Sequence, residues 1–193
     1  MSDFKPEIGR YLSVLSEVIR NLDHSQIDSA MNALMEAYEN DGRVYVFGNG
    51  GSAATASHFV CDFNKGVSVH LKKKFNLICL NDNVPTVMAI ANDCGYENIF
   101  IMQLEDRLKK DDVILAISGS GNSKNVVKAA EYAKKNGNKI VTLTGYDGGA
   151  LMKLADHPIH VNISDMQKVE DVHMILDHLM SQIIAEKLGQ KMC

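Results

Sequence analysis

The sequence lacks a long apolar run, an excess of basic residues and an N-terminus of the secretory type. No apolar stretch approaches the ~20 residues that a membrane-spanning helix needs, and the first ten residues, MSDFKPEIGR, lack the apolar core of a signal peptide. The 20 Lys and Arg against 24 Asp and Glu give a net charge of −4, which argues against a nonspecific binder of nucleic acid or of anionic membranes. We therefore expect a cytoplasmic protein that binds neither membranes nor nucleic acid directly, in which any anionic ligand is held by local geometry.

Cysteine is also scarce. The sequence has four, none in a C-x-x-C pair: Cys61, Cys79, Cys94 and Cys193. This scatter predicts reduced thiols rather than a disulfide framework or a structural zinc site.

The 193 residues are 46% apolar and 23% charged, values near the average for globular proteins, so the chain can bury a core and we expect one domain. In the first forty residues, apolar residues at helical spacing predict two amphipathic helices. They are separated near Asp23–Ser25, where Ser25 is suited to cap the second helix, which ends at Asp41–Gly42.

From residue 43 the pattern changes to short apolar runs that alternate with helical stretches. The runs cover residues 44–47, 77–80, 113–117, 140–143 and 159–163. The helical stretches cover about 52–64, 85–92, 123–136 and 148–154, and a long closing helix covers about 167–188.

Continuous apolar strands alternating with helices are typical of a parallel sheet that is buried on both faces. The sequence therefore predicts an α/β protein, a three-layer αβα sandwich of the flavodoxin-like type with a five-stranded parallel sheet. We expect residues 1–193 to form a single domain: a helical extension over 1–42, an α/β core over 43–165 and a closing helix over 166–188.

Two glycine- and serine-rich turns each follow a predicted strand and open a helix. The first is Gly48–Ser52 and the second is Ser118–Ser123. Free backbone N–H groups at such helix starts bind anions, and ligands of α/β sheets lie at the carboxyl ends of the strands. The first turn lacks the spacing of a dinucleotide fold or a P-loop. Either turn alone could be a tight turn with a helix cap, but together they favour a phosphorylated ligand.

A third glycine-rich turn, Thr144–Gly149, is interpreted as ordinary turn chemistry before a short helix.

Titratable residues gather on two of the predicted helices. His58 and Asp62 are four residues apart and so share one helix face, whereas the closing helix carries Glu170, His173 and His178. Spacing alone favours hydrogen-bonded core or interface residues over a catalytic or metal site.

The paired turns, with the segments Asn81–Asn83, Ala91–Asn98 and Leu143–Gly149, resemble the sugar isomerase (SIS) domain and, within it, the phosphoheptose isomerase branch. The resemblance extends from the first helix to about residue 188. The same branch includes replication initiator-associating proteins that isomerise nothing.

The resemblance implies a role for each matching residue. Asp62 would be the base and His178 the acid, and a zinc ion would be held by His58, Asp62, Glu170 and His178. The phosphate would lie on Ser52, Ser118, Ser120 and Ser123. The other substrate-binding residues would be Asn49, Gly50, Gly51, Asn92, Asp93, Gly119 and Asn122.

Three positions depart from the family pattern. Asp62 stands where the family has Glu, so the carboxylate is ~1 Å short, a misplacement that can lower a rate ~100-fold. Glu170 stands where the family has Gln and would add a carboxylate suited to a divalent metal. Gly119 replaces a Thr.

Glu170 and His178 are eight residues apart, about 12 Å along one helix, and so cannot bind one ion from the same helix of the same chain. Either a second subunit contributes or the helix begins after Glu170. The family forms homotetramers with active sites at subunit interfaces, so the resemblance favours the first alternative.

We expect an aldose–ketose isomerase that converts sedoheptulose 7-phosphate to D-glycero-D-manno-heptose 7-phosphate, a precursor for lipopolysaccharide or surface glycans. The alternatives are a non-catalytic sugar-phosphate-binding or initiator-associating SIS protein, and an isomerase of another phosphosugar.

Overall fold

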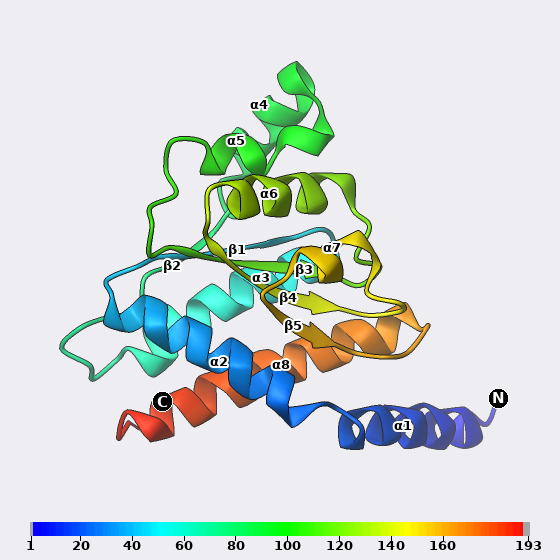
Figure 1. Ribbon diagram of the computed structural model, residues 1–193. Helices are drawn as coiled ribbons and strands as arrows, with labels where there is room; N and C mark the ends of the chain where they lie inside the picture. The colour runs from blue at the N-terminus through cyan, green and yellow to red at the C-terminus, as the bar shows by residue number, and fades with distance from the viewer. Residues whose placement is uncertain (1, 191–193) are drawn as a thin grey trace.

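The computed structural model describes residues 2–190 and has three layers around one parallel sheet (Figure 1). The strands are β1 (Val44–Gly48), β2 (Leu77–Cys79), β3 (Val113–Ser118), β4 (Lys139–Thr144) and β5 (His157–His160). Their order across the sheet is β2-β1-β3-β4-β5, and every neighbouring pair is parallel. The predicted fold class is thereby confirmed.

Helices cover both faces of the sheet (Figure 1). One face carries α2 (His24–Glu39), α3 (Gly51–Cys61) and α8 (Met166–Lys187). The other face carries α5 (Ile101–Leu104), α6 (Lys124–Lys135) and α7 (Gly149–Leu154). All residues of β1 and β3 are buried, because a strand between two helical layers has no solvent face.

The connections contain elements that the apolar pattern does not reveal. The helix α3 continues without a break into a π-helix, η1 (Asp62–Val67). After α4 (Val84–Cys94), a short 3-10 turn, η2 (Tyr96–Asn98), precedes α5. Single turns of this kind are too short to show a period in the sequence.

Two local predictions are wrong. The cap of α2 is Asp23 rather than Ser25, because the Asp23 carboxylate accepts hydrogen bonds from both the backbone N–H and the hydroxyl of Ser25. The fifth strand covers His157–His160 instead of 159–163, since its pairing with β4 begins at His157 and ends at His160.

The first helix, α1 (Lys5–Arg20), extends away from the sheet as an arm and buries no residue (Figure 1). Tyr11 ties it to α8: its hydroxyl donates to Asp171 Oδ2 over 2.5 Å, and the Lys168 ammonium lies 4.0 Å from the centre of its ring. The Phe4, Ile8 and Leu12 side chains of the arm are exposed.

No helix within residues 2–190 is long and apolar enough to cross a membrane. The cysteines at 61, 79 and 94 are free thiols, as predicted, and Cys193 lies outside the described residues.

Candidate functional site

The first glycine turn connects β1 to α3. Gly50 adopts φ +55°, a conformation that favours glycine, and α3 then begins at Gly51 without a side-chain cap. The first N–H groups of α3 therefore remain available to a ligand.

The second turn connects β3 to α6 and is held by its own serines. Ser118 Oγ accepts a hydrogen bond from the N–H of Gly121 over 3.2 Å and donates to Ser123 Oγ over 3.4 Å. Ser120 Oγ accepts from the N–H of Asn122 over 3.3 Å. The helix α6 also begins without a side-chain cap hydrogen bond at Ser123.

Both turns line one pocket of about 250 Å³ at the carboxyl ends of β1 and β3. Its lining residues are Asn49, Gly50, Gly51, Ser52, Ser118, Gly119, Ser120, Ser123, Met166 and Glu170. Eight of the eleven predicted substrate-binding residues are thus in one place, joined by Met166 and Glu170 from the start of α8.

The Thr144–Gly149 turn precedes the short helix α7, as predicted, and supports the serine turn from behind. The N–H of Gly145 donates to the Gly119 carbonyl, and the N–H of Leu151 donates to the Gly121 carbonyl, each over 2.9 Å. The Asn122 amide is used in this support: it donates to the Ser120 carbonyl and accepts from the N–H of Ala150. Asn122 therefore braces the pocket and does not line it.

We predict that Gly121→Ala destabilises the fold by about 2–3 kcal/mol, because residue 121 combines φ +64° with a Cβ position only 2.0 Å from the Gly148 carbonyl oxygen. Gly137→Ala is the matched control, since Gly137 has φ +78° but nothing within 4 Å of its Cβ position. It should lose only about 1 kcal/mol. Urea unfolding measures both, and equal losses would contradict the close contact.

Asn49 belongs to a network that sequence reasoning missed. Asn49 and Asn125 exchange two amide hydrogen bonds, of 2.9 and 2.8 Å, and the Tyr96 hydroxyl donates to Asn49 Oδ1 over 2.9 Å. Tyr96 lies within the Ala91–Asn98 segment that carries the family resemblance, so that segment was the available signal. Asn92 and Asp93 bond to each other on the exposed end of α4 and do not line the pocket.

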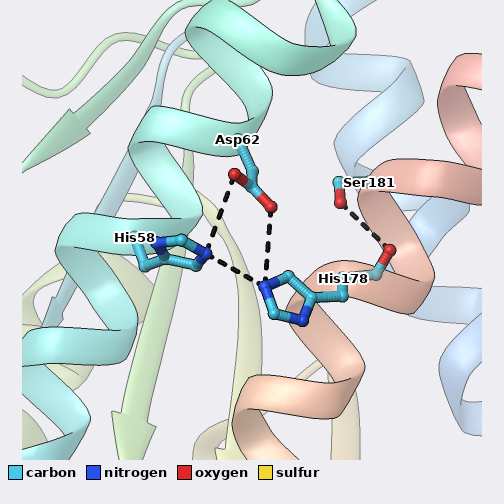
Figure 2. Close-up of polar contacts among 4 residues, drawn as sticks. All are labelled: His58, Asp62, His178 and Ser181. Carbon is cyan, nitrogen blue, oxygen red and sulfur yellow. Dashed lines mark hydrogen bonds and ion pairs between the residues drawn. The ribbon is translucent and has the colours of Figure 1, made fainter. Parts of the chain in front are cut away.

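A second cluster lies where α8 passes the end of α3 (Figure 2). The Nε2 atoms of His58 and His178 are 3.0 Å apart, and the Asp62 carboxylate oxygens lie 3.8 Å from the first and 4.0 Å from the second. His178 also accepts a hydrogen bond from Ser181 Oγ through its backbone carbonyl. One ligand atom from each of the three side chains lies within 4.8 Å of the others.

This donor set fits a divalent metal. Two imidazole nitrogens and one carboxylate are the three protein ligands typical of catalytic zinc sites, which leave a fourth position for water or substrate. Three of the four predicted ligands are thus together in a group that could hold a metal ion.

Glu170 lies elsewhere. Because α8 spans Met166–Lys187 without a break, the alternative that the helix begins after Glu170 is wrong. Gly51 lies beside Glu170, and His58 lies beside His178, so α3 and α8 run side by side in the same direction. The metal cluster and Glu170 are therefore about 12 Å apart along α8.

The chain is similar to known proteins in both its sequence and its fold. The model of the SIS domain family matches residues 9–145. A phosphoheptose isomerase of Helicobacter pylori (strain P12) is 36% identical over 187 residues, which cover 97% of this chain and 93% of that protein. The chain belongs to the SIS-domain family, in its phosphoheptose isomerase branch.

Further relatives support the assignment of this SIS domain. A phosphoheptose isomerase of Leptospira biflexa is 38% identical over 163 residues, 84% of each chain. The structure of a phosphoheptose isomerase from Francisella tularensis superposes with a TM-score of 0.87 at 28% identity, covering 96% of this chain and all of the other. The resemblance inferred from the sequence motifs is thereby confirmed.

Between the pocket and the cluster of His58, Asp62 and His178, the SIS domain buries two titratable side chains of α8. They are His173 and Asp177. Neither side chain has a hydrogen-bond partner of normal geometry among residues 2–190. Burial lowers the pKa of His173 to about 4, opposed in part by the Thr144 backbone. Burial, and then the charge of Asp62, raise the pKa of Asp177 to about 8. Both side chains are therefore uncharged near neutral pH.

The lowered pKa of His173 makes its contribution to the stability of the fold sensitive to acid. In the unfolded chain a histidine takes up its proton near pH 6.5, whereas buried His173 does so only near its folded pKa of about 4. Its contribution to stability is present above pH 6.5 and is lost as the pH falls toward 4, by at most about 1.4 kcal/mol per pH unit.

Asp177, whose pKa is raised, binds its proton at higher pH in the folded chain than in the unfolded chain, and so adds stability as the pH falls over the same range and opposes the loss at His173. We therefore expect the stability of His173→Leu, relative to that of the parent, to rise as the pH falls from 7 to 4.5, measured by urea unfolding with a chelator present. His157, whose pKa burial also lowers, adds a loss that both proteins share. His24→Leu, at an exposed position on α2, is the control and should keep the parental slope. A His173→Leu slope equal to that of the parent would contradict the prediction.

Proposed function

We propose that this chain is a phosphoheptose isomerase that converts sedoheptulose 7-phosphate to D-glycero-D-manno-heptose 7-phosphate. The observation that carries the proposal is the convergence of Asp62 with His58 and His178, in a chain that matches phosphoheptose isomerases over nearly its full length. The two-turn pocket supports it, because hydroxyls and helix N-termini bind phosphate.

The isomerisation moves a proton between C1 and C2 of the sugar through an enediolate. It needs a base beside the carbon and an acid beside the carbonyl oxygen. We assign Asp62 as the base and His178 as the acid. Ser52, Ser118, Ser120 and Ser123 would hold the phosphate, and Asn49, fixed by Asn125 and Tyr96, would orient a sugar hydroxyl.

His58, Asp62 and His178 are the residues that would hold a zinc ion. A bound zinc would supply Lewis acidity toward the substrate carbonyl. With or without a bound zinc, Asp62 must approach the reacting carbon, since it is the only carboxylate in the group of His58, Asp62 and His178.

We further propose a homotetramer with active sites shared between chains. Within one chain, Glu170 at the pocket and His178 at the cluster are about 12 Å apart along α8, so pocket and cluster do not face one compact site. The exposed apolar residues of α1 provide surface for contacts between chains.

The position of Asp62 favours one alternative, a non-catalytic sugar-phosphate-binding protein. Both carboxylate oxygens lie beyond hydrogen-bond distance from the histidines, at 3.8 and 4.0 Å. A base that is too short would leave the pocket able to bind and the cluster unable to react.

Activity is the direct test: the pure protein is incubated with sedoheptulose 7-phosphate, with and without zinc, and aldose formation is followed. We expect Asp62→Asn and His178→Gln each to lower turnover by about 10²–10⁴-fold, as for lost acid–base groups. Asp28→Asn, an exposed acid on α2, is the control. Binding of the sugar phosphate without turnover, in the parent and all variants, would establish the non-catalytic alternative.

The length of the base is tested by Asp62→Glu. We expect turnover to rise, by up to about 100-fold, because one methylene adds ~1 Å of reach and catalysis depends steeply on that distance. A fall in turnover, with sugar-phosphate affinity unchanged, would mean that the site is built for Asp.

Shared sites are tested by mixing two impaired variants, Ser120→Ala in the pocket and His178→Ala in the cluster, after dissociation and reassembly. If the pocket of one chain works with the cluster of another, roughly a quarter of the sites regain both groups, and activity at low substrate concentration rises above the mean of the two variants. Mixed assemblies with no recovered activity would place both parts of the site in one chain.

A further inference from the structure

Asp62 lies where the helix changes type, and Figure 2 shows its side chain pointing from this junction toward the two histidines. The helix α3 ends at Cys61, and Asp62 is the first residue of the π-helix η1. The N–H of Ser68 donates to the carbonyl of Phe63 over 3.2 Å, a bond that spans five residues instead of four. The π turn is a rare form that occurs mostly as a single turn within an α-helix, frequently at a functional site. We therefore expect contacts from outside the turn to select it over a continued α-helix.

Asn64 ties the π turn to the edge of the sheet. Its Nδ2 donates to the carbonyl of Leu77 over 2.8 Å, and its Oδ1 accepts from the N–H of Leu77 over 2.9 Å. Leu77 is the first residue of β2, the strand at one edge of the sheet, and an edge strand presents N–H and C=O groups that no other strand pairs. The Asn64 side chain thus takes the place of a neighbouring strand at Leu77.

Phe63 holds the same turn from the core. Its buried ring stacks on Phe59 of α3, with ring centres 5.1 Å apart, and meets Phe75 edge-on at 5.3 Å. Apolar packing is not directional, whereas hydrogen bonds depend on both distance and angle. The two bonds of Asn64 therefore fix the position of the turn more closely than the Phe63 contact does.

The short side chain of Asp62 makes this anchoring important. Its carboxylate oxygens lie 3.8 Å from His58 Nε2 and 4.0 Å from His178 Nε2, and the side chain is only 18% exposed. An aspartate has a single methylene group, so its carboxylate follows the backbone and adjusts less than that of a glutamate. A shift of the turn by about 1 Å would therefore pass to the carboxylate, and an error of that size can lower a rate ~100-fold.

We propose that Asn64 is a positioning residue: by pairing with the edge of β2, it holds the π turn of η1 in place and so sets the position of the Asp62 carboxylate between the two histidines. The inference rests on the proposed function, since it takes Asp62 to be the base of an isomerase. Asn64 belongs neither to the pocket lining nor to the candidate metal ligands, so it acts through Asp62.

The experiment removes the amide in Asn64→Ala. We expect kcat on sedoheptulose 7-phosphate, and zinc affinity measured by competition with a chelating dye, each to fall about 10–100-fold, as is typical when a group that orients a metal ligand is lost. KM should change by less than about twofold, because the pocket lies at the other end of α3. A crystal structure of the variant should show the Asp62 carboxylate displaced by ~1 Å.

A double-mutant cycle with Asp62→Glu separates positioning from a general loss of structure. The longer side chain can adjust to a displaced turn, so Asn64→Ala should lower kcat by a factor about threefold or more smaller in the Asp62→Glu background. A substitution that only weakens the fold lowers kcat by the same factor in both backgrounds.

Asn138→Ala is the matched control. Like Asn64, Asn138 bonds through its amide to the backbone of another segment, here to the carbonyls of Lys109 and Asp112 over 2.6 and 3.0 Å. It lies directly before β4, which β1 and β3 separate from β2 in the sheet. Asn138→Ala should lower the melting temperature and leave zinc affinity, kcat and KM as in the parent. Thermal unfolding checks that each variant is folded.

An Asp62 carboxylate that stays in place in Asn64→Ala would overturn the inference, and so would kcat and zinc affinity equal to those of the parent. Additive effects in the cycle would also overturn it, since they would leave Asn64 a purely structural role. If the parent does not isomerise sedoheptulose 7-phosphate, but the carboxylate moves and zinc affinity falls in Asn64→Ala, the proposed function fails and the positioning role of Asn64 remains.

Discussion

The close contact between α3 and α8 determines where every charged group of the site lies. The two helices begin together at the edge of the pocket, with Gly51 beside Glu170, and they meet again at His58 and His178. Both helices rise ~1.5 Å per residue in the same direction. The seven-residue step from Gly51 to His58 therefore covers about 10 Å and the eight-residue step from Glu170 to His178 about 12 Å, so both pairs of residues lie side by side. A side chain at position 51 would displace the Glu170 carboxylate from the start of α3.

The packing of α8 against the rest of the domain also explains why His173 and Asp177 are uncharged. Both face the packed layer between α8 and the rest of the domain, where neither finds a partner. Desolvation removes their charges, which makes burial less costly than it would be for ions. The two groups affect the pH dependence of stability in opposite directions: as the pH falls below neutral, His173 destabilises the fold and Asp177 stabilises it.

Much of the fold follows from the sequence because its signals are local and repeated. Apolar runs such as Val113–Ile117 require a sheet buried on both faces, and glycine-serine turns after strands place the pocket. The pairing of His58 with Asp62 follows from helical spacing. The position of Glu170 does not, since it depends on which residue of α8 lies opposite Gly51, a long-range register that no local pattern contains. The same holds for Asn122, whose partner Ala150 is 28 residues away.

The pocket contains no lysine or arginine among its lining residues. Binding of a phosphate there depends on N–H dipoles and hydroxyl groups that are fixed by the backbone, and these do not exchange with counterions from solution. A lysine-lined anion site weakens strongly as the ionic strength rises, because salt screens exposed charges over the Debye length. In this pocket the one full charge among the lining residues is the Glu170 carboxylate, so added salt screens a repulsion of anions instead of an attraction, and phosphate binding is not expected to weaken as the ionic strength rises.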